Sequence, residues 1–457
     1  MSFWEMPFPA GRFFLDFAWL GGLLLAGFYL RHKVEFFKRN LIPANLLAGI
    51  LGLAIGANGI HWIDLTSDRL GVYVYHLLAL LFIGLSLRSS KGKIGLSSVK
   101  TGIIFIIVYL IQGIVGLGIS LALIFSLMPD LFAGIGLLPP LSFGMNPGIA
   151  FTIGQNWEAF GFENGGIVGL TFSAAGFLAA YTTGVWIVKR GIQKGKATEM
   201  AKNQAVSSEG LQVPENQEMF SAGRITTSPG VLESLSLHVG VIGAAYLFTW
   251  GMMKLGEELL IVIGAGNEAS TLWSFHFVFA AIFALGIRKA IDLTDADRFI
   301  DDITMTRISN LFMDLMIAAS VAAISLTVVA SYWLPLLLIS SAVILVTWWV
   351  LARVIPVVFR DYKLEHLAAI YGNMTGTLQS GLLLLRILDE RMETPVSYNL
   401  VYGSGLALVL GFPLLLLINT PVHYFSDITT GFAAVLLVLL VYLALLVIGL
   451  MFINGRK

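Results

Sequence analysis

The sequence has no cysteine and few charged residues. The absence of cysteine from all 457 positions excludes disulfides, thiolate metal sites and thiol nucleophiles. Charged residues make up 12% of the chain, about half of the usual share in soluble domains. Apolar residues make up 57%, which is more than a soluble core can bury. Because helices satisfy their backbone hydrogen bonds in lipid, this composition predicts an all-α integral membrane protein.

Motifs for ATP binding and for hydrolysis are also missing. The chain has no G-x-x-x-x-G-K-[ST], no G-x-S-x-G and no H-E-x-x-H run. We therefore expect neither an enzyme nor an ATP-driven pump, and no cofactor. The formal net charge is zero, which gives no reason to expect a nucleic-acid partner. The first residues lack a basic segment and a cleavage site, so we expect no signal peptide.

Long apolar runs divide the chain into predicted membrane spans. About 20 apolar residues cross the hydrocarbon core as a helix. We expect eleven spans, with a break at 331–335 inside the uncharged run 315–352. They cover residues 14–30, 41–60, 71–87, 101–127, 164–188, 231–253, 269–287, 308–330, 333–352, 396–418 and 428–453. Two apolar segments, 131–157 and 367–385, are left over.

The distribution of positive charge orients these spans. If both leftover segments are re-entrant hairpins, 25 of the 28 Lys and Arg residues fall in loops on one side. Only Arg12, Arg69 and Lys254 fall on the other side. The positive-inside rule makes the first side cytoplasmic. We therefore expect a multi-pass protein of the cell (inner) membrane with its N-terminus outside and its C-terminus in the cytoplasm.

A polar segment at the midpoint suggests that the chain contains a repeat. Residues 190–229 read as a cytoplasmic linker. Each half then has five spans with a hairpin between the fourth and fifth, and an odd number of spans inverts the second half. FGMNPG begins at Phe143 and YGNMTG at Tyr371, 228 residues later. The predicted domains are a first repeat at 1–189 with a hairpin at 131–158, the linker, a second repeat at 230–420 with a hairpin at 365–389, and an extra C-terminal span at 421–457.

The two hairpins supply the candidate site. Broken helices inside a membrane occur where protein or a water-filled cavity surrounds them, and inverted repeats with such breaks are typical of secondary transporters. Helix N-termini at the breaks attract anions, and free carbonyls and hydroxyls bind cations such as Na⁺. The substrate-binding candidates are Ser142, Gly144, Asn146, Gly148, Asn373, Thr375, Gly376 and Thr377. The ion-binding candidates are Thr152, Gln155, Gln379, Ser380 and Asp314. The alternative for these amides and hydroxyls is that they only join helices.

Asp314 opens a second possibility for the function. It lies in the first turns of the 308–330 span, where a buried acid is a natural cation or proton site. A cation/proton exchanger that uses Asp314 is therefore an alternative to a symporter. A membrane receptor without transport is a third possibility, although the linker is too short and polar for an effector domain.

Over most of residues 15–420 the chain resembles the bacterial sodium/glutamate symporter family. The resemblance includes the start of the second span, Leu41-Ile42-Pro43-Ala44-Asn45, and the Ile83-Gly84-Leu85 turn of the third. It also includes Gly161-Phe162 before the fifth span and the segment 371–376, which follows Asp361-Tyr362.

The resemblance implies a fold and a function. The fold is two inverted five-span repeats, each with a re-entrant hairpin, and the protein is a homodimer. The function is symport of Na⁺ with glutamate by an elevator movement of the hairpin domain. The family has a histidine-bearing, glycine-rich run where this chain has Phe143 to Gly148. The expected substrate is therefore glutamate or a related small carboxylate or amino acid, with an uncharged solute as the alternative.

Overall fold

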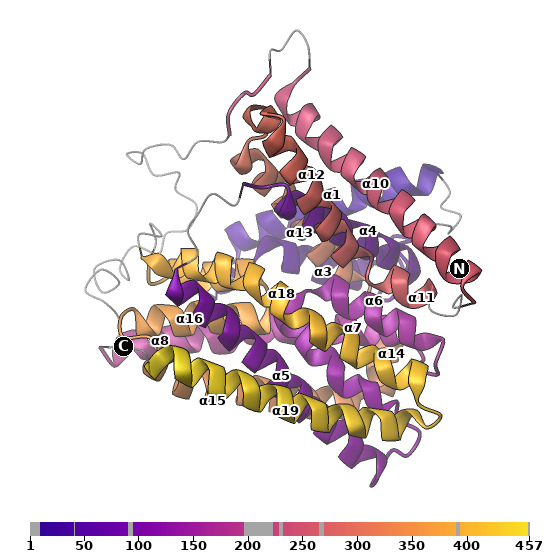
Figure 1. The fold of residues 1–457 in the computed structure, drawn as a ribbon, viewed down its shortest axis with the longest axis vertical. Coiled ribbons are helices and arrows are strands. Elements are labelled where there is room, and N and C mark those ends of the chain that lie inside the picture. The colour runs from indigo at the N-terminus through magenta and orange to yellow at the C-terminus, as the bar shows by residue number, and fades with distance from the viewer. Residues whose placement is uncertain are drawn as a thin grey trace. The chain divides into compact units, whose positions relative to one another are not determined.

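The computed structural model describes residues 10–40, 42–89, 95–195, 223–227, 232–264, 269–389 and 394–455, and every regular element in them is a helix (Figure 1). Up to the predicted linker the helices are α1 (Ala10–Lys33), α2 (Glu35–Arg39), α3 (Ala44–Ile55), α4 (Ser67–Ser86), α5 (Leu96–Ile124), η1 (Ala133–Leu137), η2 (Pro140–Met145), α6 (Pro147–Glu158), α7 (Gly165–Ala179), η3 (Ala180–Gly184) and α8 (Val185–Gln193). After it they are α10 (Ser234–Val262), α11 (Ala269–Ser274), α12 (His276–Leu293), η5 (Ala296–Phe299), α13 (Asp302–Ala322), α14 (Leu326–Ser331), α15 (Trp333–Val358), α16 (Lys363–Thr375), α17 (Leu378–Arg386), α18 (Pro395–Tyr424) and α19 (Ile428–Gly455).

Eight helices in the described part of the chain are long and apolar enough to cross a membrane. They confirm an all-helical, multi-pass membrane protein. The type of membrane and the orientation of the termini stay predictions. The eight segments are Arg12–Lys33, Ser67–Ser86, Leu96–Ile124, Gly165–Gln193, Ser234–Val262, Trp333–Val358, Pro395–Tyr424 and Ile428–Asn454.

The other three predicted spans are shorter or interrupted helices. α3 has only 12 residues, because the chain turns back after Ile55 and the N–H of Trp62 bonds to the Ile55 carbonyl. The predicted 269–287 span is divided at Phe275, between α11 and α12. The predicted 308–330 span ends at Ala322, and α14 follows after a short break. The break predicted at 331–335 is confirmed, since α14 ends at Ser331 and α15 begins at Trp333.

The described helices form two compact units, and the first is built around α4. It contains α1 as far as Phe28, α3 from Leu47, and α4, α10, α11, α12 and α13. α4 packs against α10, α12 and α13 through a core that includes Ile83, Ile242 and Ile308. Near the start of α4 the buried carboxylate of Asp16 pairs with Arg69 at 2.8 Å.

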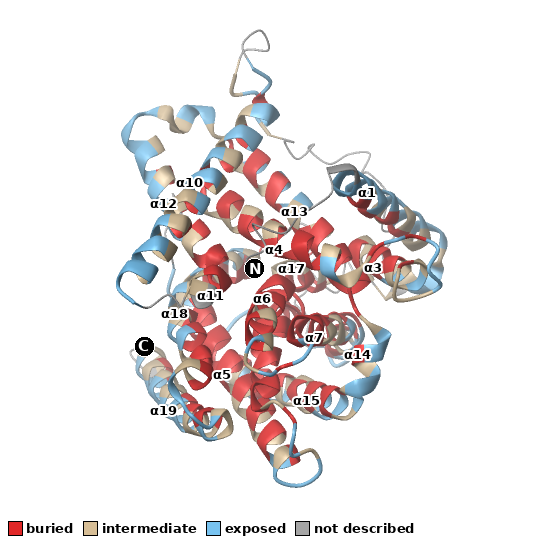
Figure 2. Cartoon of the chain, turned by 90° about the vertical axis from the view of Figure 1, so that its right-hand side faces the viewer, coloured by how far each residue is buried: buried red, intermediate tan, exposed pale blue. Residues whose placement is uncertain are grey.

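The second unit is built around α5 and contains both leftover segments. α5 packs against α15, α18 and α19, and α6 packs against α7. α6 and α7 are largely buried, whereas α19 exposes much of its apolar surface (Figure 2). Each unit takes helices from both sides of the predicted linker, most of which lies outside the described residues. The inverted repeat and its boundaries stay predictions.

Candidate functional site

The first leftover segment is a pair of helical segments that reverses at Asn146. η1 and η2 lead into the tip, Asn146 is extended at φ −175° and ψ 141°, and α6 leads away. The ring of Phe132, before η1, stacks on Phe162 at 4.8 Å and lies 5.7 Å from Trp157 near the end of α6. The two ends of the segment are therefore neighbours, and its two arms run antiparallel. We call residues 132–158 the first hairpin.

The second leftover segment reverses at Gly376 and Thr377. α16 ends at Thr375 and α17 begins at Leu378, with Thr377 extended at φ −148° and ψ 174°. The two arms touch closely, because a Cβ atom on Gly372 would lie 2.9 Å from the Cα of Gly381. This contact pairs residues on either side of the tip, so α16 and α17 also run antiparallel. We call residues 363–386 the second hairpin.

One face of α5 contacts both tips. The hydroxyl of Tyr109 donates to the carbonyl oxygen of Gly144 at 3.0 Å, next to the first tip. One turn later, Nε2 of Gln112 donates to the carbonyl oxygen of Met374 at 2.9 Å, next to the second tip. Residues three apart share a helix face, and both donors lie near the middle of this 29-residue helix. Both tips therefore lie about halfway along a membrane-spanning helix.

Two other helices complete the surroundings of the tips. Gln112 Nε2 also donates to Thr347 Oγ1 at 3.0 Å, near the middle of α15. On α7, a Cβ atom at Gly176 would overlap the Thr375 carbonyl oxygen and lie 3.0 Å from the Phe143 ring. Gly176 thus touches both hairpins, and only a residue without a side chain allows this approach.

The predicted substrate residues of the first hairpin are all buried but largely serve its own structure. The side-chain oxygen of Asn146 accepts from the Gly148 N–H at 2.8 Å and caps α6. The Ser142 hydroxyl donates to the Pro139 carbonyl at 3.2 Å. Gly144 offers its carbonyl to Tyr109. The tip of this hairpin is therefore held together by its own side chains and by α5.

The predicted substrate residues of the second hairpin differ in this respect. Asn373 Nδ2 donates to Ser404 on α18 at 3.2 Å, and the Thr375 hydroxyl donates to the Tyr371 carbonyl at 2.8 Å. Gly376 is buried. Thr377 is 1% exposed, and its hydroxyl has no hydrogen-bond partner among the described residues. It does not cap α17 either, so the N–H groups of that first turn receive no side-chain cap from it.

The predicted ion-binding residues are not gathered into one set. Thr152 is buried, and its hydroxyl finds no partner in the described part of the chain. Gln155 donates to Glu158 at 2.6 Å, and Ser380 bonds to the Tyr181 hydroxyl at 2.6 Å. Gln379 is half-buried in the first turn of α17.

Asp314 belongs to the other compact unit. It is half-buried on α13. The structure therefore does not place it in one unit with the other four ion-binding candidates, and the exchanger that uses Asp314 stays a prediction.

Sequence reasoning missed the residues that hold the tips. Tyr109, Gln112 and Thr347 lie inside long apolar spans, and Gly176 lies in a helix rich in small residues. Gln112 could have been identified from the sequence, because it is the one amide in the uncharged segment 101–127. A polar side chain at membrane depth faces a partner or a cavity far more often than lipid.

The two tips carry no charged side chain. No Asp, Glu, Lys or Arg occurs in residues 131–157 or 366–385. Besides Thr377 and Thr152, Gln112 has a buried oxygen, Oε1, without a described partner. An uncapped helix N-terminus suits an anion, and neutral oxygens suit a cation such as Na⁺. Within the described residues, no group of three or more His, Asp or Glu side chains suits a transition metal.

We compared the chain with models of protein families, with curated proteins and with solved structures, and none of them matches it.

Proposed function

We propose that the protein is a secondary active transporter that couples Na⁺ entry to the uptake of glutamate or a related small carboxylate or amino acid. The observation that carries this proposal is the pair of hairpin tips halfway along α5, with buried hydroxyl and amide oxygens that have no partner among the described residues. A buried polar atom without a partner costs free energy, so a bound ligand that pairs with it stabilises the protein.

In this proposal the second tip binds the substrate. The carboxylate lies at the N-terminus of α17, where Thr377 and the backbone N–H groups donate to it. Na⁺ is carried with the substrate and is bound by neutral oxygens near the tips, which include Thr152 Oγ1 and Gln112 Oε1, two oxygens without a partner in the described part of the chain. The two hairpins enter the membrane from opposite sides as re-entrant elements of an inverted repeat.

The division into units supports an elevator mechanism. Both hairpins and the helices that contact their tips belong to one unit, and the other unit contains neither hairpin. In an elevator the hairpin unit carries the bound substrate across as a body while the other unit stays in place. The proposed homodimer forms through the unit without hairpins.

Transport into proteoliposomes tests the proposal. Labelled glutamate, aspartate or another small carboxylate accumulates under an inward Na⁺ gradient, and accumulation stops when K⁺ replaces Na⁺. Uptake that is equal in Na⁺ and K⁺ removes the sodium coupling. A thermal-shift screen of amino acids and carboxylates, with and without Na⁺, identifies the substrate to be labelled.

A substitution at Thr377 tests the site. Thr377→Val keeps the shape of the side chain and removes its hydroxyl, so we expect substrate affinity to fall about tenfold, the effect of roughly 1.4 kcal/mol. Thr249→Val is the matched control, because Thr249 is equally buried but its hydroxyl is bonded to the Ala245 carbonyl within α10 of the other unit. Equal affinities in the two variants contradict the placement of substrate at the second tip.

A further inference from the structure

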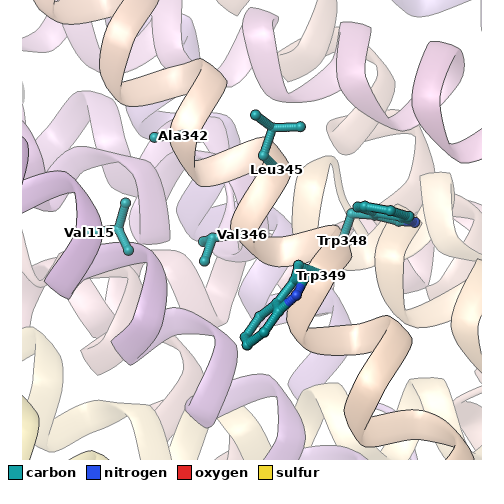
Figure 3. A pocket seen from close by; sticks show the side chains of 6 residues that line it. All are labelled: Val115, Ala342, Leu345, Val346, Trp348 and Trp349. Atoms are coloured by element: carbon teal, nitrogen blue, oxygen red, sulfur yellow. The ribbon is translucent and has the colours of Figure 1, made fainter.

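An apolar groove runs along α15. Its volume is about 410 Å³, and it is lined by Val115 of α5 and by Ala342, Leu345, Val346, Trp348 and Trp349 of α15 (Figure 3). Leu345 is 63% exposed and Trp349 is 52% exposed, so the groove opens outward. α5 and α15 are both among the membrane-spanning helices. The surroundings of the groove are therefore lipid rather than water.

Two arginines and three tryptophans lie at one end of this groove. The guanidinium of Arg353 lies 5.2 Å from the centroid of the Trp349 ring, and that of Arg190 lies 5.3 Å from the Trp186 ring. The rings of Trp186 and Trp348 meet edge to face at 6.1 Å. This contact joins α8 to α15, so the two arginine–tryptophan pairs belong to one continuous surface.

The order of side chains along α15 follows the order of groups in a phospholipid. Leu345, Trp349 and Arg353 follow one another at intervals of four residues, so they lie on one face of the helix with a rise of about 6 Å from each to the next. The apolar groove comes first, then the indole ring and then the cation, toward the end of the helix. Tryptophan prefers the level of the glycerol and headgroups, and arginine reaches the phosphates.

The positive charge at this end of the groove is not neutralised by the described part of the protein. Arg190 and Arg353 are exposed, and neither takes part in the ion pairs found among the described residues. Two cations on an outward surface beside an apolar groove are complementary to a molecule with an anionic head and an apolar tail. In a membrane that molecule is an anionic glycerophospholipid.

We propose that this surface is a binding site for an anionic glycerophospholipid. Its acyl chain occupies the groove, and its phosphate lies between Arg190 and Arg353. By the distribution of basic residues along the sequence, the lipid belongs to the cytoplasmic leaflet. The groove residues Val346 and Trp348 flank Thr347, which accepts from Gln112, so the lipid lies one residue from the contacts that hold the second tip. The proposal requires only that the chain crosses a membrane, and it is independent of the transported substrate.

Lipid titration of the detergent-purified protein tests this site. Phosphatidylglycerol is added, with phosphatidylcholine of the same acyl chains as the neutral comparison, and binding is followed by native mass spectrometry and by melting temperature. We expect tighter binding of phosphatidylglycerol. Each arginine near the surface contributes about 1 kcal/mol, so Arg190→Gln/Arg353→Gln should weaken its binding roughly 30-fold.

Two control variants separate the site from general charge attraction. Arg360→Gln/Lys363→Gln removes the same charge from exposed positions between the end of α15 and the start of α16, and it should retain the preference for phosphatidylglycerol. Ala342→Leu fills the groove without a change of charge, and it should weaken binding of both lipids. The proposal is wrong if both double variants lose the preference equally, or if Ala342→Leu binds both lipids as the wild type does.

Discussion

The two hairpins have the same outline but different tips. Both reverse at extended residues near the middle of α5, and both are buried against long helices. At the first tip Asn146 caps the helix that follows it. At the second tip the Thr377 hydroxyl does not cap α17 and has no hydrogen-bond partner among the described residues. The first tip is therefore closed by its own cap, whereas the second tip leaves groups to which a ligand can bind.

The largest effect should come from Gly176, which touches both hairpins. In Gly176→Val the new side chain overlaps the Thr375 carbonyl and presses on Phe143, so we expect a loss of roughly 3 kcal/mol of stability and of all transport. Melting of the purified protein and uptake measure the two losses. Gly405→Val is the control, because Gly405 lies in α18 with open space around it. Similar melting temperatures for the two variants would show that the hairpins do not meet at Gly176.

The next effect distinguishes the two tips directly. Asn146→Ala removes the cap and leaves the Gly148 N–H buried without its partner, so we expect about 2 kcal/mol of destabilisation. Asn146→Ser keeps a capping oxygen and should recover most of it. Thr377→Val should instead change ligand affinity with little change in the ligand-free melting temperature. The comparison fails if Asn146→Ala lowers affinity but leaves the melting temperature unchanged.

A smaller effect concerns the two donors on α5. Tyr109→Phe removes the bond to the first tip and should cost about 1 kcal/mol of stability. Gln112→Leu removes the bond to the second tip at a similar cost, and it also removes Oε1, a proposed oxygen for Na⁺. We therefore expect the dependence of uptake on Na⁺ to change in Gln112→Leu alone. The same Na⁺ dependence in both variants would assign Gln112 to structure only.

The smallest effect is a pH dependence that lies outside both hairpins. Burial raises the pKa of Asp301, but hydrogen bonds from Thr304 and from the Arg224 backbone outweigh it and hold the pKa below its ordinary value. A lowered pKa in the folded state stabilises the protein above about pH 4, and this stability is lost as the pH falls through the folded pKa. Thr304→Val removes one of these hydrogen bonds, so the melting temperature of the variant should fall less than that of the wild type as the pH is lowered. The tips carry no charged side chain, so in Thr377→Val the melting temperature should depend on acidic pH as it does in the wild type.

The two helix breaks could be located from the sequence because they depend on local chemistry. Asn146-Pro147 and Gly376-Thr377 interrupt apolar runs at the residues where the helices end. The role of each polar side chain could not be predicted, since the same amide serves as a helix cap or as a ligand. The partners of Gln112 lie 235 and 262 residues further along the chain, and no local pattern reveals them. The 41–60 span was predicted too long, because hydropathy measures the length of an apolar run and does not show that the chain turns back after Ile55.

The composition of the two units has a consequence for how the protein is made. A ribosome delivers α5 and the first hairpin long before α15, α16 and α18 exist. Until then the amide of Gln112 lacks Thr347 and Met374, and the indole of Trp157 lacks its acceptor Asn419, which lies 262 residues later. Such groups are costly in lipid. The half-synthesised chain therefore has polar groups without their final partners, and neither unit is complete before the second half has entered the membrane.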